Sequence, residues 1–425
     1  MFSKRPVGSM VFVLVLALSV SLTAAGVAAA KTTITVMDWR INSTRTAQEY
    51  FQTIKERFEE LFPDAEVQYL DVSMNDIVDK LLTGVVTGTA PDVVTLSMLW
   101  ARDLYEQGLL LELTDLVAKT PTHTPDQFIP VTQLYNQVGG EIFGITIAMD
   151  AAILFYNEDH FEEAGLDTDP YAIATWDEFT EAAKKLVRRQ GDGSVSRYAI
   201  AGTPFNFARP EPFNSWLVAN GGSFYADEGL TRAGFNTQAG RETLEHMYNL
   251  ATVHEVVGGN FTSRTASMHH GVNSTPRVFL QQAPDMRFNM TSYPQGPSGT
   301  GRGTTVWGNM MSIPRSTTNV DLAWEYIKLF TSLEGSVYMF NILDYVGSPR
   351  FDFYQSPEWL HGQERHKWMR MIPEIVMVGG IYPYRRSTEL APIWAEHVQQ
   401  AVAGARPLGG ALEEAERLYN QVLSQ

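Results

Sequence analysis

Four tryptophans have the residue type and position that best suit ligand binding. Each is expected at the end of a strand or beside a loop, outside any helical stripe; they are Trp39, Trp100, Trp216 and Trp307. The flat C–H face of a pyranose ring packs on an indole, while its hydroxyls need polar partners in the same plane. An isolated Trp is more often core packing, and this remains the alternative for all four.

Polar side chains that could meet such hydroxyls lie within a few residues of these tryptophans or at a strand end. The candidates are Arg40, Ser97, Asp150, Asn214 and Asn309. Their carboxylate, guanidinium, amide and hydroxyl groups supply both hydrogen-bond donors and acceptors. A site that hydrogen-bonds a hydroxyl rejects ligands that lack it, because its buried polar groups would go unpaired. For Asp150 the simpler alternative is to cap a turn between two strands.

Other chemistry finds little support in the sequence, so we expect no catalytic residue, metal or cofactor. The chain has no Cys, which excludes disulfides, thiol nucleophiles and Cys-ligated metals. Adjacent side chains such as His269 and His270 seldom point at one ion, and no HExxH motif accompanies them. The run GPSGTGRGTT lacks the Gly-Lys-Ser/Thr ending of a phosphate-binding loop and indicates a connector.

The elements that must position these residues begin with alternating strands and helices. Strands are expected over 34–37, 67–70 and 93–96, with amphipathic helices over 46–62 and 77–85 between them. This order predicts a mostly parallel sheet with right-handed crossovers. Ligands of such open sheets lie beyond the carboxyl ends of the strands, which points to residues 38–40 and 97–100.

A second α/β unit is expected over residues 151–293. It contains a capping box, Thr175 to Glu178, that starts a helix over 176–189, and a helix that ends at 220–222. A Pro/Gly/Ser-rich connector follows over 294–303. A strand over 304–313 and an amphipathic helix over 320–330 come next.

Residues 1–30 have the pattern of a secretory signal peptide. Lys4 and Arg5 precede an uncharged apolar core, and an A-x-A site ends at Ala30. We expect cleavage after Ala30, export to the periplasm and no lipid anchor, since no Cys follows the core. An uncleaved membrane anchor is the alternative, because residues 7–30 are long enough to span a bilayer. The formal net charge of −16 argues against nucleic acid and anionic membrane partners.

The stretch from Gly140 to Leu186 resembles a known family signature. It reads GEIFGITIAMDAAILFYNEDHFEEAGL, then a short loop, then ATWDEFTEAAKKL. In order and spacing it resembles the extracellular solute-binding proteins of carbohydrate ABC importers (family 1, maltose-binding-protein-like), although Thr146 stands where the family has Pro. Further segments with counterparts in that family, in the same order, are APDVV, SWLVANGG, RTASMHHG and TVWGNMMSIPRS.

The resemblance implies an α/β, periplasmic-binding-protein-like fold. Two lobes, each with a mostly parallel sheet flanked by helices, would enclose a ligand cleft. The expected first lobe is 31–148 plus 294–346, and the second is 149–293 plus 347–425. The resemblance also implies that Tyr384 reaches the cleft, although Tyr382 and Arg385 suit this role equally well.

By the same resemblance, the chain would be a monomeric, non-enzymatic binder. It would close on a carbohydrate and deliver it to the permease subunits of an ABC transporter. Two alternatives stay open at this point. An exported carbohydrate-active enzyme would need two carboxylates about 5–10 Å apart across the ligand. A ligand-binding adaptor for a membrane sensor would use the same lobes. Monosaccharides, oligosaccharides, polyols and sugar acids or phosphates are all compatible ligands.

Overall fold

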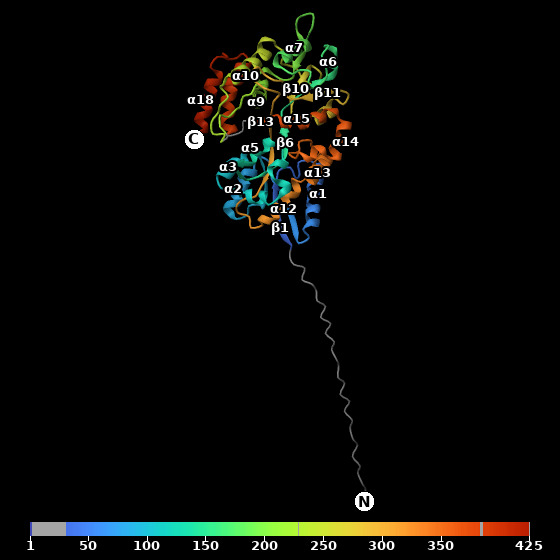
Figure 1. Cartoon of the computed structure of the whole chain (residues 1–425), viewed down its shortest axis with the longest axis vertical. Helices are drawn as coiled ribbons and strands as arrows, with labels where there is room; N and C mark the ends of the chain where they lie inside the picture. The colour runs from blue at the N-terminus through green and yellow to red at the C-terminus, as the bar shows by residue number, and fades with distance from the viewer. Residues whose placement is uncertain (2–30, 228, 383–385, 425) are drawn as a thin grey trace.

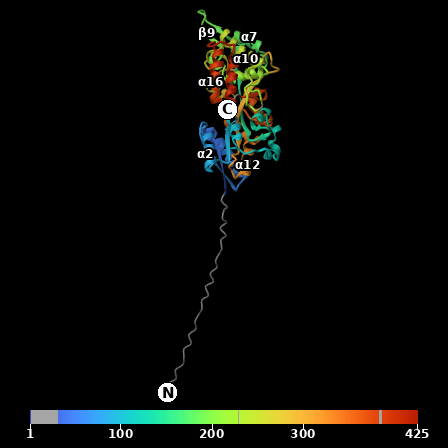
Figure 2. The ribbon, with the colours of Figure 1, turned by 90° about the vertical axis from the view of Figure 1, so that its left-hand side faces the viewer.

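The computed structural model describes Met1 and residues 31–227, 229–382 and 386–424. The expected signal peptide, Tyr384 and Arg385 therefore lie outside the described residues. Figures 1 and 2 show two lobes, one above the other along the long axis, with β6, β13 and α15 near their junction. No helix of the described ranges combines the length and the apolar character that a membrane span requires.

The first lobe contains most of the N-terminal third of the chain and returns for a later segment. Its strands are β1 (Thr32–Asp38), β2 (Ala65–Asp71), β3 (Val93–Ser97), β4 (Gln137–Val138), β5 (Glu141–Ile142), β6 (Ile145–Ala151), β12 (Thr304–Ser312) and β13 (Gly379–Ile381). Its helices are α1 (Arg45–Leu61), α2 (Ile77–Thr87), α3 (Met98–Glu106), α4 (Thr114–Ala118), α5 (Gln133–Asn136), α12 (Val320–Phe330) and α13 (Leu333–Leu343).

The main sheet of this lobe has the order β13-β12-β3-β1-β2, and β6 also pairs with β12. β1 pairs in parallel with β2 and β3, which confirms the predicted βαβαβ unit. Alternate residues of β1 point to opposite sides of the sheet, and helices cover both sides. Ile34 and Val36 join a core with α1 and α12, whereas Met37 joins a core with α2 and α3.

The second lobe holds a five-stranded sheet and most of the remaining helices. Its strands are β7 (Ile153–Asn157), β8 (Arg188–Arg189), β9 (Val195–Ile200), β10 (Ala266–Gly271) and β11 (Phe288–Thr291). The later helices are α6 (Glu158–Glu163), α7 (Trp176–Leu186), α8 (Pro204–Phe207), α9 (Pro210–Ala219), α10 (Gln238–Tyr248), α11 (Thr275–Gln282), α14 (Pro357–Arg365), α15 (Ile372–Met377), α16 (Ser387–Trp394), α17 (Gln400–Val402) and α18 (Ala411–Leu423).

Seven short 3₁₀ or π segments connect these elements in the described residues. They are η1 (Pro121–His123), η2 (Pro125–Gln127), η3 (Pro130–Thr132), η4 (Asn249–Val253), η5 (Asp352–Gln355), η6 (Lys367–Met371) and η7 (Ala395–Gln399).

The second sheet, in the order β11-β7-β10-β9-β8, differs from the predicted mostly parallel arrangement. Only β9 and β10 pair in parallel among its described strands; the other three pairings are antiparallel. One physical reason is local, since only a short turn separates β8 from β9, and short turns join antiparallel strands. The predicted capping box at Thr175 and Glu178 is confirmed, but α7 ends at Leu186, three residues earlier than expected.

The chain passes between the sheets at several points, the first of them at Ala152. This single residue separates β6 of the first sheet from β7 of the second. Asn273 of the second lobe braces this crossing: its Oδ1 accepts from Ala151 N at 3.2 Å, and its Nδ2 donates to Met149 O at 2.8 Å. β13 pairs with β12 in the first sheet, although it lies in the range 347–425 expected in the second lobe. The exact lobe boundaries stay a prediction.

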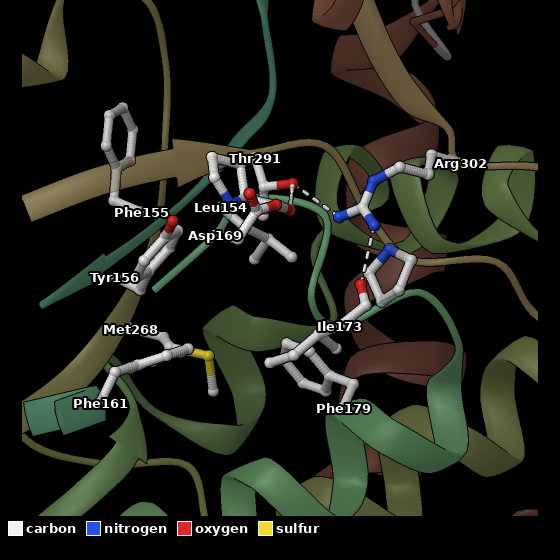
Figure 3. Close-up of a pocket in the computed structure, with 12 residues that line it drawn as sticks. Leu154, Phe155, Tyr156, Phe161, Asp169, Ile173, Phe179, Met268, Thr291 and Arg302 are labelled. Carbon is white, nitrogen blue, oxygen red and sulfur yellow. Dashed lines mark hydrogen bonds between the residues drawn. The ribbon is translucent and has the colours of Figure 1, made fainter. Parts of the chain in front are cut away.

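The connector over 294–303 is tied firmly to the second lobe. Arg302 donates through Nη1 to Ile173 O at 2.7 Å and through Nη2 to Thr291 Oγ1 at 2.6 Å, as Figure 3 shows. Tyr293 and Gly303 also exchange backbone hydrogen bonds at 2.9 and 3.1 Å. The connector therefore returns the chain to β12 along a fixed path.

Candidate ligand-binding site

The carboxyl end of β1 presents a closed ion pair. Asp38 is fully buried and accepts from Arg40 at two positions, Nε to Oδ1 at 3.0 Å and Nη2 to Oδ2 at 2.5 Å. Thr95 Oγ1 also donates to Asp38 Oδ2 at 2.5 Å. The Arg40 guanidinium lies 5.6 and 5.7 Å from the ring centroids of Phe51 and Phe330. Because Asp38 neutralises it, Arg40 presents little free positive charge to a ligand.

Two of the candidate tryptophans meet beside this pair. Trp39 follows β1 and Trp100 lies in the first turn of α3; their ring centroids are 6.3 Å apart in an edge arrangement. Both are partly exposed. Ser97 is 3% exposed, and its hydroxyl caps α3 by accepting from Leu99 N at 3.2 Å. Trp39 and Trp100 thus lie together beyond the carboxyl ends of β1 and β3, the edge to which the rule for open parallel sheets pointed.

The third tryptophan reaches the same edge of the sheet from the antiparallel strand β12. Trp307 lies directly opposite Asp150 of β6, and Asn309 lies opposite Ser97 of β3. Directly opposite residues project from the same face of a sheet. Trp307, Asn309 and Asp150 are partly exposed, so this part of β12 offers an aromatic ring, an amide and a carboxylate at one edge.

Asp150 is the carboxylate whose protonation is most perturbed in this region. Burial, and then the nearby charge of Glu211, raises the pKa of Asp150 to about 6, against a hydrogen bond from Tyr345. Tyr345 also donates to Met149 O at 2.8 Å. The alternative in which Asp150 caps a turn does not apply, because Asp150 lies inside strand β6.

Glu211 is a carboxylate near Asp150 that the sequence analysis missed. It lies in the first turn of α9, and its Oε1 is 3.1 Å from His270 Nε2 on β10. His270 Nδ1 in turn forms a hydrogen bond with the Tyr293 hydroxyl. Burial acts to raise the pKa of Glu211, but the hydrogen bond and charge of His270 outweigh it, so the pKa lies below its ordinary value. The Pro-Glu-Pro helix start was a visible signal for its position, but its pairing with His270 is non-local.

Asn214 joins the two lobes close to Trp307, and Tyr382 lies beside that tryptophan. Asn214 is 1% exposed, and its Nδ2 donates to Thr305 Oγ1 at 3.0 Å and to Ile381 O at 2.8 Å. The Tyr382 ring lies 5.3 Å from the Trp307 ring. Asn214 therefore ties α9 to β12 and β13, while Tyr382, an alternative to Tyr384 in the sequence analysis, lies beside the Trp307 ring.

The fourth tryptophan does not belong to this group, which corrects the sequence analysis. Trp216 lies inside α9, in neither a loop flank nor a strand end, and is fully buried. Its ring packs edge-on against Trp176, Phe179 and Tyr293 at 5.0–5.8 Å. Phe213, Trp216 and Leu217 recur at helical spacing on α9, so Trp216 lies on the face that packs into the core of the second lobe.

Two neighbouring histidines and two arginines with the chemistry to bind a metal or an anion are engaged elsewhere in the structure. His269 and His270 are neighbours on β10 whose side chains point to opposite faces, as expected in a strand. No group of three or more potential His, Cys, Asp or Glu metal ligands occurs in the part of the chain that is described. Two arginines that could have received an anion are paired instead, Arg350 with Asp352 at 2.6 Å and Arg264 with Asp285 at 2.7 Å.

The cavities differ sharply in size. The pocket in Figure 3, inside the second lobe, is lined largely by apolar side chains and has a free volume of only about 20 Å³, which suits a single water. A groove of about 980 Å³ runs between α5 and the β4–β5 turn on one side and α9, residues 222–227, Gly229 and Leu230 on the other. A groove of about 370 Å³ lies between α11 and α13 and includes Tyr345. Of the candidate residues from the sequence analysis, Asn214 lines the larger groove, and the candidate tryptophans and Asp150 line neither.

Comparisons with known proteins agree with this architecture. Residues 42–336 match the family model described as bacterial extracellular solute-binding protein. The sugar-binding protein MalE of Xanthomonas citri has a similar fold, with a TM-score of 0.79 and 19% identity over 92% of this chain and 98% of that one. The cyclic α-maltosyl-1,6-maltose binding protein of Arthrobacter globiformis also gives 0.79, at 18% identity over 92% and 99%. The arabinooligosaccharide-binding protein of Halalkalibacterium halodurans is 25% identical over 70% of this chain and 68% of its own.

Two helix-flanked sheets with an aromatic and acidic edge between them define a two-lobed periplasmic-binding-protein fold, which serves to bind a solute. The chain belongs to the bacterial extracellular solute-binding protein family. It is a solute-binding protein of an ABC transporter. This family is not enzymatic, so the alternative of an exported carbohydrate-active enzyme is set aside.

Proposed function

We propose that this protein binds a carbohydrate or sugar derivative between its lobes and delivers it to the permease of an ABC importer. The observation that carries the proposal is the gathering of Trp39, Trp100 and Trp307 with the Asp150 carboxylate at one edge of the first sheet. Indole faces suit the apolar face of a sugar ring, and a carboxylate accepts hydrogen bonds from its hydroxyls. Two relatives are named for the maltose-type and arabinose-type oligosaccharides that they bind, and these names support the same class of ligand.

The proposed ligand contacts come from the sequence analysis, with one removal. They are Trp39, Arg40, Trp100, Asp150, Trp307 and Asn309, with Ser97 and Asn214 as supporting residues and Tyr384 kept as a prediction outside the described residues. Trp216 is removed because it is fully buried.

The proposed mechanism is hinge closure. A ligand held by the first-lobe edge and by the facing second lobe stabilises a closed form, which the permease then recognises. The single residue Ala152 between β6 and β7 makes this crossing short, and short crossings suit rotation of one lobe against the other. We further propose a periplasmic monomer, exported with a signal peptide that is cleaved after Ala30 and without a lipid anchor.

A thermal-shift screen against a sugar library tests the proposal, because a ligand that binds only the folded state raises its apparent stability. The panel would contain arabino-, malto- and xylo-oligosaccharides, lactose and the corresponding monosaccharides. We expect at least one of these to raise the melting temperature, and Trp307→Ala to abolish that rise. A sugar response that Trp100→Ala and Trp307→Ala both leave intact would show that the site lies elsewhere.

A further inference from the structure

Glu211 of the second lobe lies next to the face of β12 from which Trp307 projects. The Glu211 backbone carbonyl accepts from Thr305 Oγ1 at 3.3 Å and from Ser215 Oγ at 2.9 Å. Thr305 and Trp307 are two residues apart on an extended strand and so project to the same side. Asp150, directly opposite Trp307, projects to that side as well. Two carboxylates, one from each lobe, therefore face the same space.

The Glu211 carboxylate is held in a fixed orientation. Its Oε1 pairs with His270 Nε2 at 3.1 Å, and His270 is held through Nδ1 by the Tyr293 hydroxyl. Tyr293 is fully buried, so it anchors the hydrogen-bonded series Glu211–His270–Tyr293 in the core of the second lobe. Oε2 has no hydrogen-bond partner within the described ranges, and the Glu211 side chain is 15% exposed. Oε2 is therefore a pre-positioned acceptor.

Among the described residues, the cations near these two carboxylates are either paired or exposed. Arg40 is engaged by Asp38 through Nε and Nη2, so its charge is largely neutralised. Arg209 is exposed and lies close enough to Glu211 to lower its pKa. His270 engages Oε1 of Glu211 and Arg209 is exposed, so neither side chain hydrogen-bonds Oε2 within the described residues. A ligand anion placed at Oε2 would meet a like charge, and like charges repel strongly in a partly buried site.

From this geometry we infer that Glu211 contacts the ligand and that Glu211 and Asp150 select uncharged polyhydroxylated ligands over sugar acids and sugar phosphates. The inference rests on the proposed function and narrows its ligand class. Ligand hydroxyls donate to carboxylate oxygens, and the two oxygens of one carboxylate match two neighbouring hydroxyls. A ligand carboxylate or phosphate supplies only acceptors and negative charge at the same positions. Because Asp150 and Glu211 come from different lobes, one neutral ligand joins both.

The experiment compares matched neutral and anionic probes on the whole protein. Thermal shift and calorimetry would use glucose against glucuronate and glucose 6-phosphate, galactose against galacturonate, and maltotriose and arabinotriose as longer neutral probes. We expect neutral probes to stabilise the wild-type protein and their anionic counterparts to bind at least 10-fold more weakly. Glu211→Gln is expected to weaken the best neutral probe by at least 10-fold and to reduce the neutral-to-anionic preference.

Two further variants keep the result interpretable. Glu211→Asp retains the charge but shortens the side chain, so it should lose affinity while still rejecting anionic probes. Glu181→Gln makes the matched substitution on the exposed face of α7 in the same lobe and should leave all affinities within twofold. Circular dichroism melting of each unliganded variant checks that it is folded.

The outcomes separate the inference from the proposed function. If no sugar of the panel stabilises the protein, the proposed function fails and the inference fails with it. If a sugar binds in a Trp307-dependent manner but Glu211→Gln changes its affinity by less than twofold, only the inference fails. Binding of glucuronate or glucose 6-phosphate as tight as that of glucose would also overturn the inference alone.

Discussion

Asp150 and Trp307 lie directly opposite each other on the antiparallel strands β6 and β12, although 157 positions separate them in the sequence. This pair stands at the edge where the first sheet meets the second lobe. The indole offers an apolar face, and the carboxylate beside it offers hydrogen-bond acceptors. The other proposed contacts lie around this pair, so its variants are the most informative.

Trp307→Ala and Trp216→Ala should separate binding from stability. Trp307 is partly exposed, so its truncation should cost little folding free energy but should remove the ligand-induced thermal shift. Trp216 is fully buried, and its truncation should destabilise the fold by about 3–5 kcal/mol. Denaturant unfolding and thermal shift with the best sugar check both expectations. A Trp307→Ala protein as unstable as Trp216→Ala would contradict the placement of Trp307 at a binding surface.

Asp150 should make the unliganded protein less stable as the pH rises from 4 to 6. Burial and the charge of Glu211 raise the pKa of Asp150 to about 6, above the value near 3.9 expected in the unfolded chain. The contribution of the protonated form is thus complete below pH 4 and lost as the pH rises through 6, and it amounts to about 2–3 kcal/mol. Urea unfolding of wild type and Asp150→Asn between pH 4 and 8 measures this. The variant should gain relative stability above pH 6, and parallel pH profiles would refute the assignment.

His246 should contribute to acid sensitivity with the opposite dependence on pH. Burial lowers the pKa of His246 to about 3, and its ring stacks on Trp176 at 4.3 Å. The unfolded chain binds a proton near pH 6.5 that the folded protein does not, so stability is lost as the pH falls from 6.5 towards 3. His246→Phe removes the proton and preserves an aromatic ring. Its melting temperature should therefore fall less than that of wild type between pH 7 and 5; an equal fall would exclude His246 as a source of the effect.

Asn273→Ala should weaken the crossing between the lobes. Asn273 is 4% exposed and hydrogen-bonds the backbone of Met149 and Ala151, so its truncation leaves the Ala151 N–H without a partner at a cost of about 1–3 kcal/mol. Unfolding free energy measures this loss. Asn319→Ala, which removes an amide from the first lobe away from the crossing, is the control. An effect of Asn273→Ala no larger than that of the control would argue against a brace at this position.

Gly347→Ala should disturb the same crossing by a steric route. A Cβ at Gly347 would lie 1.8 Å from Met149 O, so the two segments must move apart. We expect a loss of stability. We also expect an altered affinity for the best sugar, since both segments lie beside Tyr345, which hydrogen-bonds Asp150. Gly301→Ala, at a position where a Cβ meets nothing within 4 Å, is the matched control. Equal thermal shifts in both variants would contradict this expectation.

Local patterns in the sequence determined much of the first lobe. The apolar periodicity placed β1, α1, β2, α2 and β3 within a few residues, and the parallel order followed from the alternation of strands and helices. The rule for open sheets then brought Trp39 and Trp100 to one edge. The capping box at Thr175 likewise marked the exact start of α7. These features depend on residues close in the chain, so a sequence records them directly.

Tertiary structure alone decided which side chains share the site. Trp216 and Trp307 look alike in sequence, but packing of α9 buries the first and the register of β12 exposes the second. The pairing of Glu211 with His270 joins residues 59 positions apart, and no local spacing signals it. The physical reason is that burial and charge pairing depend on contacts between distant segments, whereas helix and strand periodicity depends on neighbours. The sequence thus determined the family and the scaffold of the first lobe, and the fold determined the strand directions of the second sheet and the polar groups that a ligand would meet.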